Sequence, residues 1–434
     1  MRTPFSPRLT LVLALMALAA LNGFASSQIG APSAYDVPPE NWEARARLAD
    51  TIFAPVRDAA GAGRQVIPQA SGAAKVRFQT DVQSDSLYLV FANQVGGDYP
   101  LDGAGAWIIK RSLKDGSFLQ AKVFVQEGPG TYLRLFPEGE RTLMDVYLFG
   151  EPFQTGVALP VAFDRLVTAP LSSVMEWSAA VVNWPLVLAP APGPGDQRLG
   201  GIVKTLQPLL PRLRDMDDGA MDGTGRLVSI ASGAAAPRGG FNCSGFAKWV
   251  VDALYAPLAG KPMDIAPLKS RNAARTNSWS TRFEEELDPY FGLDWSRGLA
   301  RAAAQARTGV TPSDEQIDVR DSDYLPYIKD VGYPVAKLEY LLYFLTRKNP
   351  GTIYVGSVNA PSLLAVSEGT PTLRQHHHVI VLFPYFDARG VFRVAVMERN
   401  VRTSLVSLNR RYGNEYVHLE RIDSEGSFVP PRIE

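Results

Sequence analysis

The sequence contains very little cysteine and histidine. Of its 434 residues, one is cysteine, Cys243, and four are histidine. A single cysteine excludes an intramolecular disulfide and a cysteine-rich zinc module. Lysine plus arginine and aspartate plus glutamate balance at 44 each, so the chain lacks the basic excess of a general nucleic-acid binder. The placement of the few cysteine and histidine residues therefore carries most of the information on function.

Long apolar runs are also missing beyond the N-terminus. Arg2 and Arg8 precede an apolar run at residues 9–21, and small residues follow it. This pattern predicts a signal peptide over residues 1–25, since the run is shorter than the ~20 residues of a membrane-spanning helix. No cysteine follows that would carry a lipid anchor. The sequence predicts a periplasmic or secreted protein without stable membrane insertion, with an uncleaved N-terminal anchor as the alternative.

The remaining chain divides by composition into two domains. Between residues 74 and 150, short apolar runs alternate with turn residues and predict about six strands. Residues 26–184 are therefore expected to form a β-rich, sandwich-like domain, with a small barrel as the alternative. Proline and glycine are concentrated at residues 185–201, which predicts a linker. Residues 202–434 mix helical and strand patterns, so the fold class expected for the whole chain is α+β.

Cys243 lies where a helix is predicted to begin. Apolar side chains recur at helical spacing from Phe246 to Leu254, and Pro257 is expected to stop the helix. Asn242 is a good N-cap residue, which places Cys243 in the first helical turn. There the positive end of the helix dipole favours the thiolate, and free backbone N–H groups are available to an oxyanion. The position is typical of a reactive cysteine rather than a buried structural one.

Three of the four histidines are consecutive: His376, His377 and His378. They open a buried strand that a turn at residues 387–390 connects to a returning strand. A symmetric turn would put His378 opposite Arg399, with Glu398 and Asn400 beside it. Either Glu398 or Asn400 would then orient the imidazole. Strand alternation places His376 and His378 on one face and His377 on the other, and a register slip of one residue would substitute His377 for His378.

These motifs together resemble the NlpC-type papain-like cysteine peptidases, which are bacterial cell-wall hydrolases. The motif at residues 241–246, Phe-Asn-Cys-Ser-Gly-Phe, resembles their nucleophile motif. Residues 350–356 and 378–381 are similar to their first barrel strand and their histidine strand. The resemblance implies a papain-like C-terminal domain in which Cys243 is the nucleophile and His378 the base. It also implies Asn242 and Ser244 as substrate-binding residues, no metal or cofactor, and amide bonds of peptidoglycan stem peptides as substrate.

The sequence departs from the family at three places. Asn242 replaces the aspartate that precedes the nucleophile in the family. The upstream tyrosine signature is replaced by Leu-Val-Ser-Ile at residues 227–230. An insertion at residues 258–333 separates the two halves of the site, with helices expected at 282–287 and 296–306. It either caps or narrows the cleft or merely decorates the domain, and the sequence leaves both alternatives open. These departures leave the nucleophile in place and weaken the assignment of a substrate.

Three hypotheses compete at this point. The first is an exported cysteine hydrolase whose partner is peptidoglycan or another envelope amide, cleaved by Cys243, His378 and either Glu398 or Asn400. The second is a metal protein in which His376, His378 and Glu398 hold Zn²⁺. The third is a binding or scaffolding protein that keeps the papain-like fold without turnover.

Overall fold

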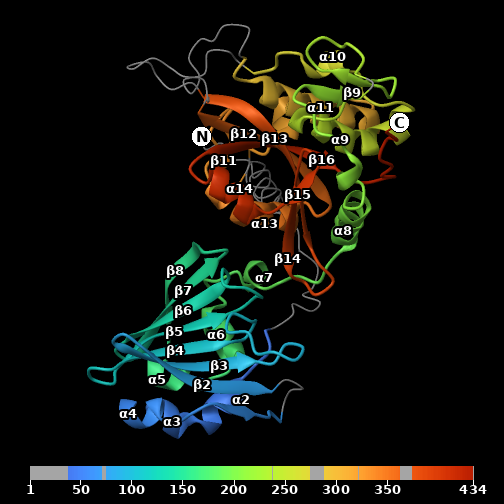
Figure 1. Cartoon of the computed structure of the whole chain (residues 1–434). Coiled ribbons are helices and arrows are strands. Elements are labelled where there is room, and N and C mark those ends of the chain that lie inside the picture. Colours follow the sequence, from blue (N-terminus) through green and yellow to red (C-terminus); the bar gives the residue numbers. More distant parts are fainter. Residues whose placement is uncertain are drawn as a thin grey trace, which may run out of the picture.

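The computed structural model describes residues 38–70, 75–236, 238–273, 288–320, 322–361 and 374–433. The predicted signal peptide at 1–25 and the predicted helix at 282–287 lie outside these ranges. The chain mixes helices with two large antiparallel sheets, one in each of two domains (Figure 1). Within the described ranges, no helix combines the length and apolar character needed to cross a membrane.

The N-terminal domain is built on one eight-stranded antiparallel sheet whose strands follow one another in chain order. The strands are β1 (Gln65–Ile67), β2 (Val76–Gln83), β3 (Ser86–Asn93), β4 (Trp107–Ser112), β5 (Phe118–Phe124), β6 (Tyr132–Glu138), β7 (Arg141–Leu148) and β8 (Glu151–Leu159). The six strands expected from the sequence are β2 to β7. The expected sandwich is wrong, because the described strands form a single meander whose apolar face is covered by helices, and β1 and β8 are not paired as a closed barrel would require.

Short helices supply that cover. They are α2 (Trp42–Arg47), α3 (Ala49–Phe53), α4 (Val56–Ala60), α5 (Phe163–Leu166) and α6 (Leu171–Ser178). Their buried side chains, such as Ile52, Phe163 and Val174, join the strand side chains in one hydrophobic core. Alternate residues of β4 and β7 are buried, as expected for a sheet with one covered face.

The segment predicted as a linker is largely helical, which corrects the expectation for residues 185–201. Helix α7 (Trp184–Val187) and helix α8 (Pro194–Leu206) leave only 188–193 as the connection. Proline is tolerated in the first helical turn, where Pro194 lies, and the Asp196 carboxylate accepts a hydrogen bond from the Gly193 backbone at 2.9 Å. A β-carbon at Gly195 would lie 2.7 Å from the Gly351 backbone nitrogen, so a glycine that suggests a helix breaker instead permits close packing of α8.

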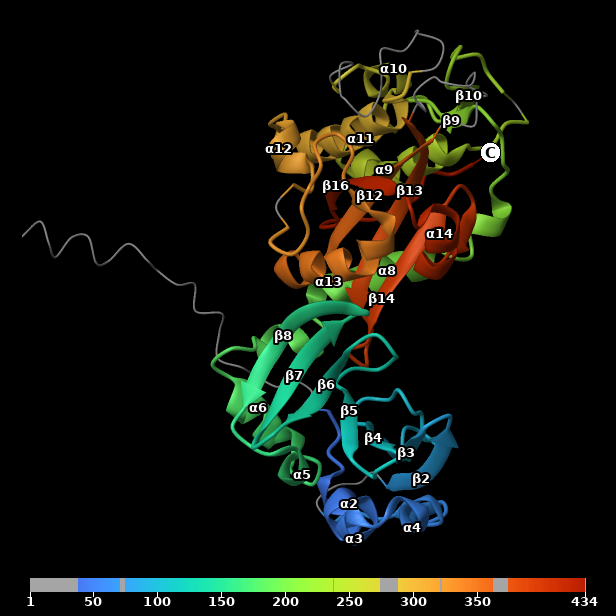
Figure 2. The same ribbon diagram turned by 90° about the vertical axis from the view of Figure 1, so that its left-hand side faces the viewer.

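The second domain is a six-stranded antiparallel sheet of order β11-β16-β12-β13-β14-β15. Its strands are β11 (Tyr333–Pro334), β12 (Thr352–Pro361), β13 (Arg374–Phe386), β14 (Phe392–Glu398), β15 (Val401–Thr403) and β16 (Tyr416–Asp423), and a separate pair is formed by β9 (Gly219–Met221) and β10 (Leu227–Ser229). Helices α8, α9 (Cys243–Ala259) and α11 (Phe291–Thr308) pack on one face of the sheet. Helices α13 (Leu338–Lys348) and α14 (Leu405–Tyr412) pack on the other, as Figure 2 shows. Two short helices, α10 (Ile265–Leu268) and α12 (Asp314–Ile317), belong to the predicted insertion.

The two domains meet at the tip of the β7–β8 hairpin. Phe149 and Gly150 both have positive φ, as a two-residue turn between antiparallel strands requires. The ring of Phe149 packs against Tyr343 of α13 and Phe392 of β14, with centroids 5.0 and 5.5 Å away. Gln126 donates hydrogen bonds to the Val187 carbonyl and the Tyr343 hydroxyl. One hydrophobic core therefore extends through both domains.

Candidate active site

The N-terminus of α9 positions Cys243 as the first residue of the helix. Asn242 is the N-cap, and its Oδ1 accepts a hydrogen bond from the Gly245 backbone N–H at 2.7 Å. The expected cap and helix start are thus confirmed, although the helix continues two residues past Pro257. Gly245 is needed because a β-carbon there would lie 1.9 Å from the Gly219 carbonyl of β9. The close approach of β9 to Gly245 therefore fixes the position of the first turn of α9, and with it the position of the Cys243 thiol.

The partner of the thiol comes from β13. His378 interacts with the Cys243 thiol and lowers its pKa, and the Val379 backbone N–H acts on the sulfur in the same direction. On its other side, His378 Nε2 lies 2.7 Å from Glu398 Oε2 at the end of β14. With Nε2 committed to the carboxylate, Nδ1 is the ring nitrogen left for the sulfur. Of the predicted site residues, the structure therefore brings together Cys243, His378 and Glu398.

Asn400, the other predicted orienting residue, does not face the imidazole. Its Nδ2 donates to the Leu213 carbonyl at 2.9 Å. The predicted register was also wrong by one residue: β13 and β14 are joined by a five-residue turn in which the Asp387 N–H donates to the Val391 carbonyl. The ladder ends at the pair Val381 and Met397, so Arg399 is not paired with His378.

The electrostatics of the three side chains are coupled. Burial alone raises the pKa of the Cys243 thiol, but its hydrogen bond to His378 and the charge of that ring outweigh burial, so the net pKa is below the ordinary value. Burial disfavours the imidazolium, yet Cys243 and Glu398 together raise the pKa of His378 to about 9. Burial also opposes ionisation of Glu398, but its bonds to His378, Arg411 and Thr403 lower its pKa to about 2. At neutral pH these directions favour a thiolate–imidazolium pair beside a carboxylate.

Three residues that the sequence analysis did not identify complete the surroundings of the imidazole. The Thr403 hydroxyl donates to Glu398 Oε1 at 2.6 Å, and the Arg411 guanidinium pairs with the same oxygen. The ring of Tyr412 stacks on His378 with centroids 5.9 Å apart. Thr403 is in β15 and the other two are in α14, so no local motif links them to the histidine strand. Only the fold of the β14–β15 hairpin brings them to it.

The three adjacent histidines have different environments. A β-bulge pairs Asn359 with His376 and Val358 with His378, so His377 is the extra residue. Because the bulge interrupts the alternation, His377 and His378 both lie against Tyr412, which corrects the expected face assignment. His376 is buried, and desolvation lowers its pKa to about 3. Its Nδ1 lies 2.9 Å from the hydroxyl of Ser357, so His376 has a structural role in the sheet.

The insertion at 258–333 covers one side of the site. Helix α11 packs against α9, and the Trp295 indole N–H donates to the Ser244 carbonyl at 2.9 Å. The cleft has a volume of about 440 Å³, and its lining residues are Asp217, Asn242, Cys243, Ser244, Asp288, Phe291, Gln375, His376, His377 and Arg399. Asn242 and Ser244, predicted as substrate-binding residues, both line the cleft. Asp288 and Phe291 belong to the insertion, which therefore contributes to the lining of the cleft.

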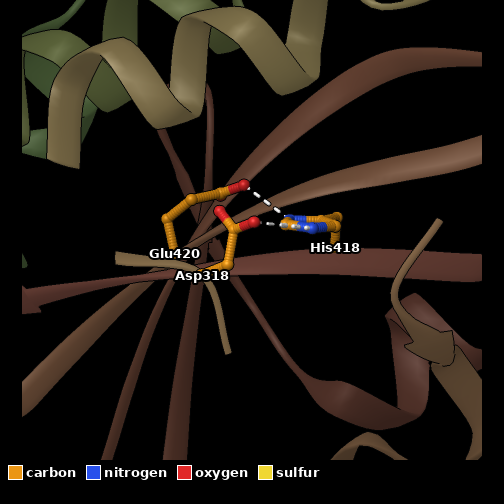
Figure 3. Close-up of side chains that lie close together, drawn as sticks. All are labelled: Asp318, His418 and Glu420. Atoms are coloured by element: carbon orange, nitrogen blue, oxygen red, sulfur yellow. Dashed lines mark hydrogen bonds and ion pairs between the residues drawn. The ribbon is translucent and has the colours of Figure 1, made fainter. Parts of the chain in front are cut away.

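A second cluster of titratable groups is buried away from the cleft. Asp318, His418 and Glu420 place one donor atom each within 4.8 Å of one another, and Figure 3 shows their side chains converging. Among the residues that the structure describes, only this group has the composition and spacing of a metal site. However, Arg297 and Arg320 already bind the Asp318 carboxylate, and His418 bonds Glu420 through Nδ1 at 2.7 Å. With two guanidiniums holding the carboxylate, the donor set fits a buried ion-pair network better than a cation.

The zinc site considered from the sequence is not assembled either. In the described part of the chain, His376, His378 and Glu398 do not form a grouping with metal-ligand spacing. The two histidines have different partners: His376 bonds Ser357 and the Asp330 carbonyl, whereas His378 bonds Cys243 and Glu398.

Comparison with known proteins gives one match. Residues 36–186 match a family described as a domain of unknown function (DUF8515). This range covers the N-terminal sheet and its helices and ends before α8. Neither the curated proteins nor the solved structures contain a match to the chain.

Proposed function

We propose that the protein is an exported cysteine hydrolase that cleaves amide bonds with Cys243 as nucleophile. The observation that carries the proposal is the connected series of Cys243, His378 and Glu398 at the N-terminus of α9. A lone structural thiol has no need of a helix terminus, an imidazole with a raised pKa and a buried carboxylate behind it.

The proposed reaction follows from this order of contacts. The Cys243 thiolate attacks the carbonyl carbon, and the oxygen that becomes negative is stabilised by backbone N–H groups at the start of α9. The His378 imidazolium gives its Nδ1 proton to the leaving amine, which breaks the C–N bond and leaves a thioester. Neutral His378 then takes a proton from water, which attacks the thioester and regenerates the thiolate. Glu398 holds the ring and stabilises its charged form throughout.

The resemblance to the NlpC-type peptidases supports a papain-like arrangement and peptidoglycan stem peptides as substrate. The order along the chain is the same: nucleophile helix α9, strand β12, histidine strand β13, and a polar residue at the end of β14. An antiparallel sheet packed on the nucleophile helix is consistent with this fold. Asn242 in place of aspartate and the missing tyrosine signature indicate that the amine end of the substrate is contacted differently.

The first test is the rate of Cys243 alkylation by iodoacetamide as a function of pH. The wild-type thiol should react with an apparent pKa well below the ~8.5 of a free thiol. In His378→Ala, the apparent pKa of the thiol should rise towards that free value. A thiol that is inert, or that titrates normally and ignores the His378 substitution, would refute the hydrolase.

Digestion of purified peptidoglycan then tests the substrate, with Cys243→Ala as the inactive control. New amine and carboxyl termini in stem peptides, absent with the control, are expected. An activated thiol without such products would leave the hydrolase proposal standing and rule out peptidoglycan stem peptides as its substrate. Binding of peptidoglycan that survives Cys243→Ala, with no products from the wild type, would favour the scaffolding alternative.

A further inference from the structure

A cavity larger than the catalytic cleft is lined in part by residues 238–241, the segment that directly precedes Asn242 and Cys243. Its volume is about 730 Å³, compared with about 440 Å³ for the cleft at Cys243, and the two have no lining residue in common. A volume of this size is typical of small-molecule sites. We call it the arginine pocket, after Arg212, Arg214, Arg238 and Arg432, which line it.

All the charged residues that line the arginine pocket are positive. Four of its fourteen lining residues are arginines and none is acidic, although the chain as a whole has no net charge. None of the four guanidiniums has a carboxylate partner in the described part of the chain. By contrast, Arg374 is paired with Glu415 at 2.6 Å and Arg399 with Asp215 at 2.7 Å. Four unpaired guanidiniums around one cavity make it strongly attractive to an anion.

The floor of the same pocket is apolar. Its apolar lining residues with accessible surface are Leu209 and Leu227, which are half-buried, and Ile433, which is 37% exposed. Leu213, Phe241 and Trp249 lie beneath them and are almost fully buried. The C-terminal segment forms one wall, and it is held in place because the Trp249 indole N–H donates to the Pro431 carbonyl at 3.0 Å. A ligand that fits this site therefore combines an anionic group with an apolar body.

We propose that the arginine pocket binds an amphiphile that carries a phosphate group. Phosphate is preferred to carboxylate because its multiple charge and three or more oxygens can engage several guanidiniums at once. The apolar body would lie against Leu209, Leu227 and Ile433. This site goes beyond the proposed hydrolase, since it needs neither Cys243 nor His378. It would hold its ligand against residues 238–241, which run directly into Asn242 and the nucleophile.

Calorimetric titration of the whole protein with four probes tests this proposal: octyl phosphate, octanoate, octyl glucoside and inorganic phosphate. Octyl phosphate is expected to bind at least about ten-fold more tightly than each of the others, and to weaken as salt is raised. Equal binding of octyl glucoside would refute the role of charge. Equal binding of inorganic phosphate would refute the apolar floor, and equal or tighter binding of octanoate would refute the phosphate preference.

Matched variants locate the binding. Arg214→Gln/Arg238→Gln should weaken octyl phosphate at least about ten-fold, whereas Arg57→Gln/Arg141→Gln, which removes two exposed arginines of the N-terminal domain, should not. Unchanged affinity in the first variant would overturn the proposal. Its circular dichroism and its Cys243 alkylation rate should match the wild type, and if it does not fold, Arg432→Gln in the C-terminal segment provides the same test. Cys243→Ala should bind octyl phosphate normally, which separates this proposal from the hydrolase.

Discussion

The carboxylate behind the imidazole offers the sharpest test of the site. Glu398→Gln keeps the shape of the side chain and removes the charge that lies 2.7 Å from His378. An opposite charge at such a distance typically shifts a pKa by about 1–3 units. The pKa of His378, raised to about 9 in the wild type, should therefore fall to roughly 6–8 in the variant. Each unit corresponds to ~1.4 kcal/mol of lost stabilisation of the imidazolium.

The thiol must respond because the imidazolium stabilises the thiolate. The apparent pKa of Cys243 should rise by about one unit or more in Glu398→Gln, so that alkylation below that pKa slows by about ten-fold per unit. The assay is the iodoacetamide rate from about pH 4 to about pH 10, a range that brackets the thiol and imidazole pKa values. Asn400→Ala is the matched control, since that amide bonds the Leu213 carbonyl instead. A Glu398→Gln profile that overlays the wild type, or an equal shift in Asn400→Ala, would refute the assigned triad.

Three further predictions concern stability. The pKa of His378 is raised from 6.5 to about 9, so its ionisation contributes about 3 kcal/mol to the free energy of unfolding. This contribution should be complete below pH 6.5 and lost as the pH rises to about 9. Urea unfolding of the wild type and His378→Ala at several pH values checks this, and a pH-independent difference between them would contradict it. Arg297→Ala should cost about 3–5 kcal/mol because it leaves the buried carboxylate of Asp330 without its guanidinium and that of Asp318 with Arg320 alone. A loss under ~1 kcal/mol in thermal denaturation would show that the network is dispensable. Asn242→Ala should cost about 0.5–2 kcal/mol through the lost helix cap, and Asn242→Asp should recover most of it in the same measurement.

Much of the candidate site could be predicted because its elements have strong local signals. Asn242 and the apolar spacing after it identify the start of α9, and the run of β-branched residues after His378 identifies β13. The strands β2 to β7 of the first domain were predicted for the same reason. Glu398 was named beside Asn400, since a hairpin brings the end of β14 near the start of β13 whatever its exact register.

The features that could not be predicted depend on geometry between elements. The register of β13 and β14 is set by a turn one residue longer than the symmetric one assumed, and the bulge at His377 is a mismatch between two strands rather than a property of either. Arg411 and Tyr412 reach the imidazole only because α14 folds back after β15. Pro194 suggested a linker because the signals for a proline-led helix and for a loop are the same at that point.

The hairpin tip at Phe149 has a consequence for how the chain can be divided. Since that ring packs against Tyr343 and Phe392, cleavage in the connection at 188–193 would leave an aromatic surface exposed on each fragment. The two domains are therefore not interchangeable modules, and we expect them to melt in one cooperative transition. Any ligand that stabilises the front domain would then also protect the surroundings of Cys243 from unfolding, through packing alone.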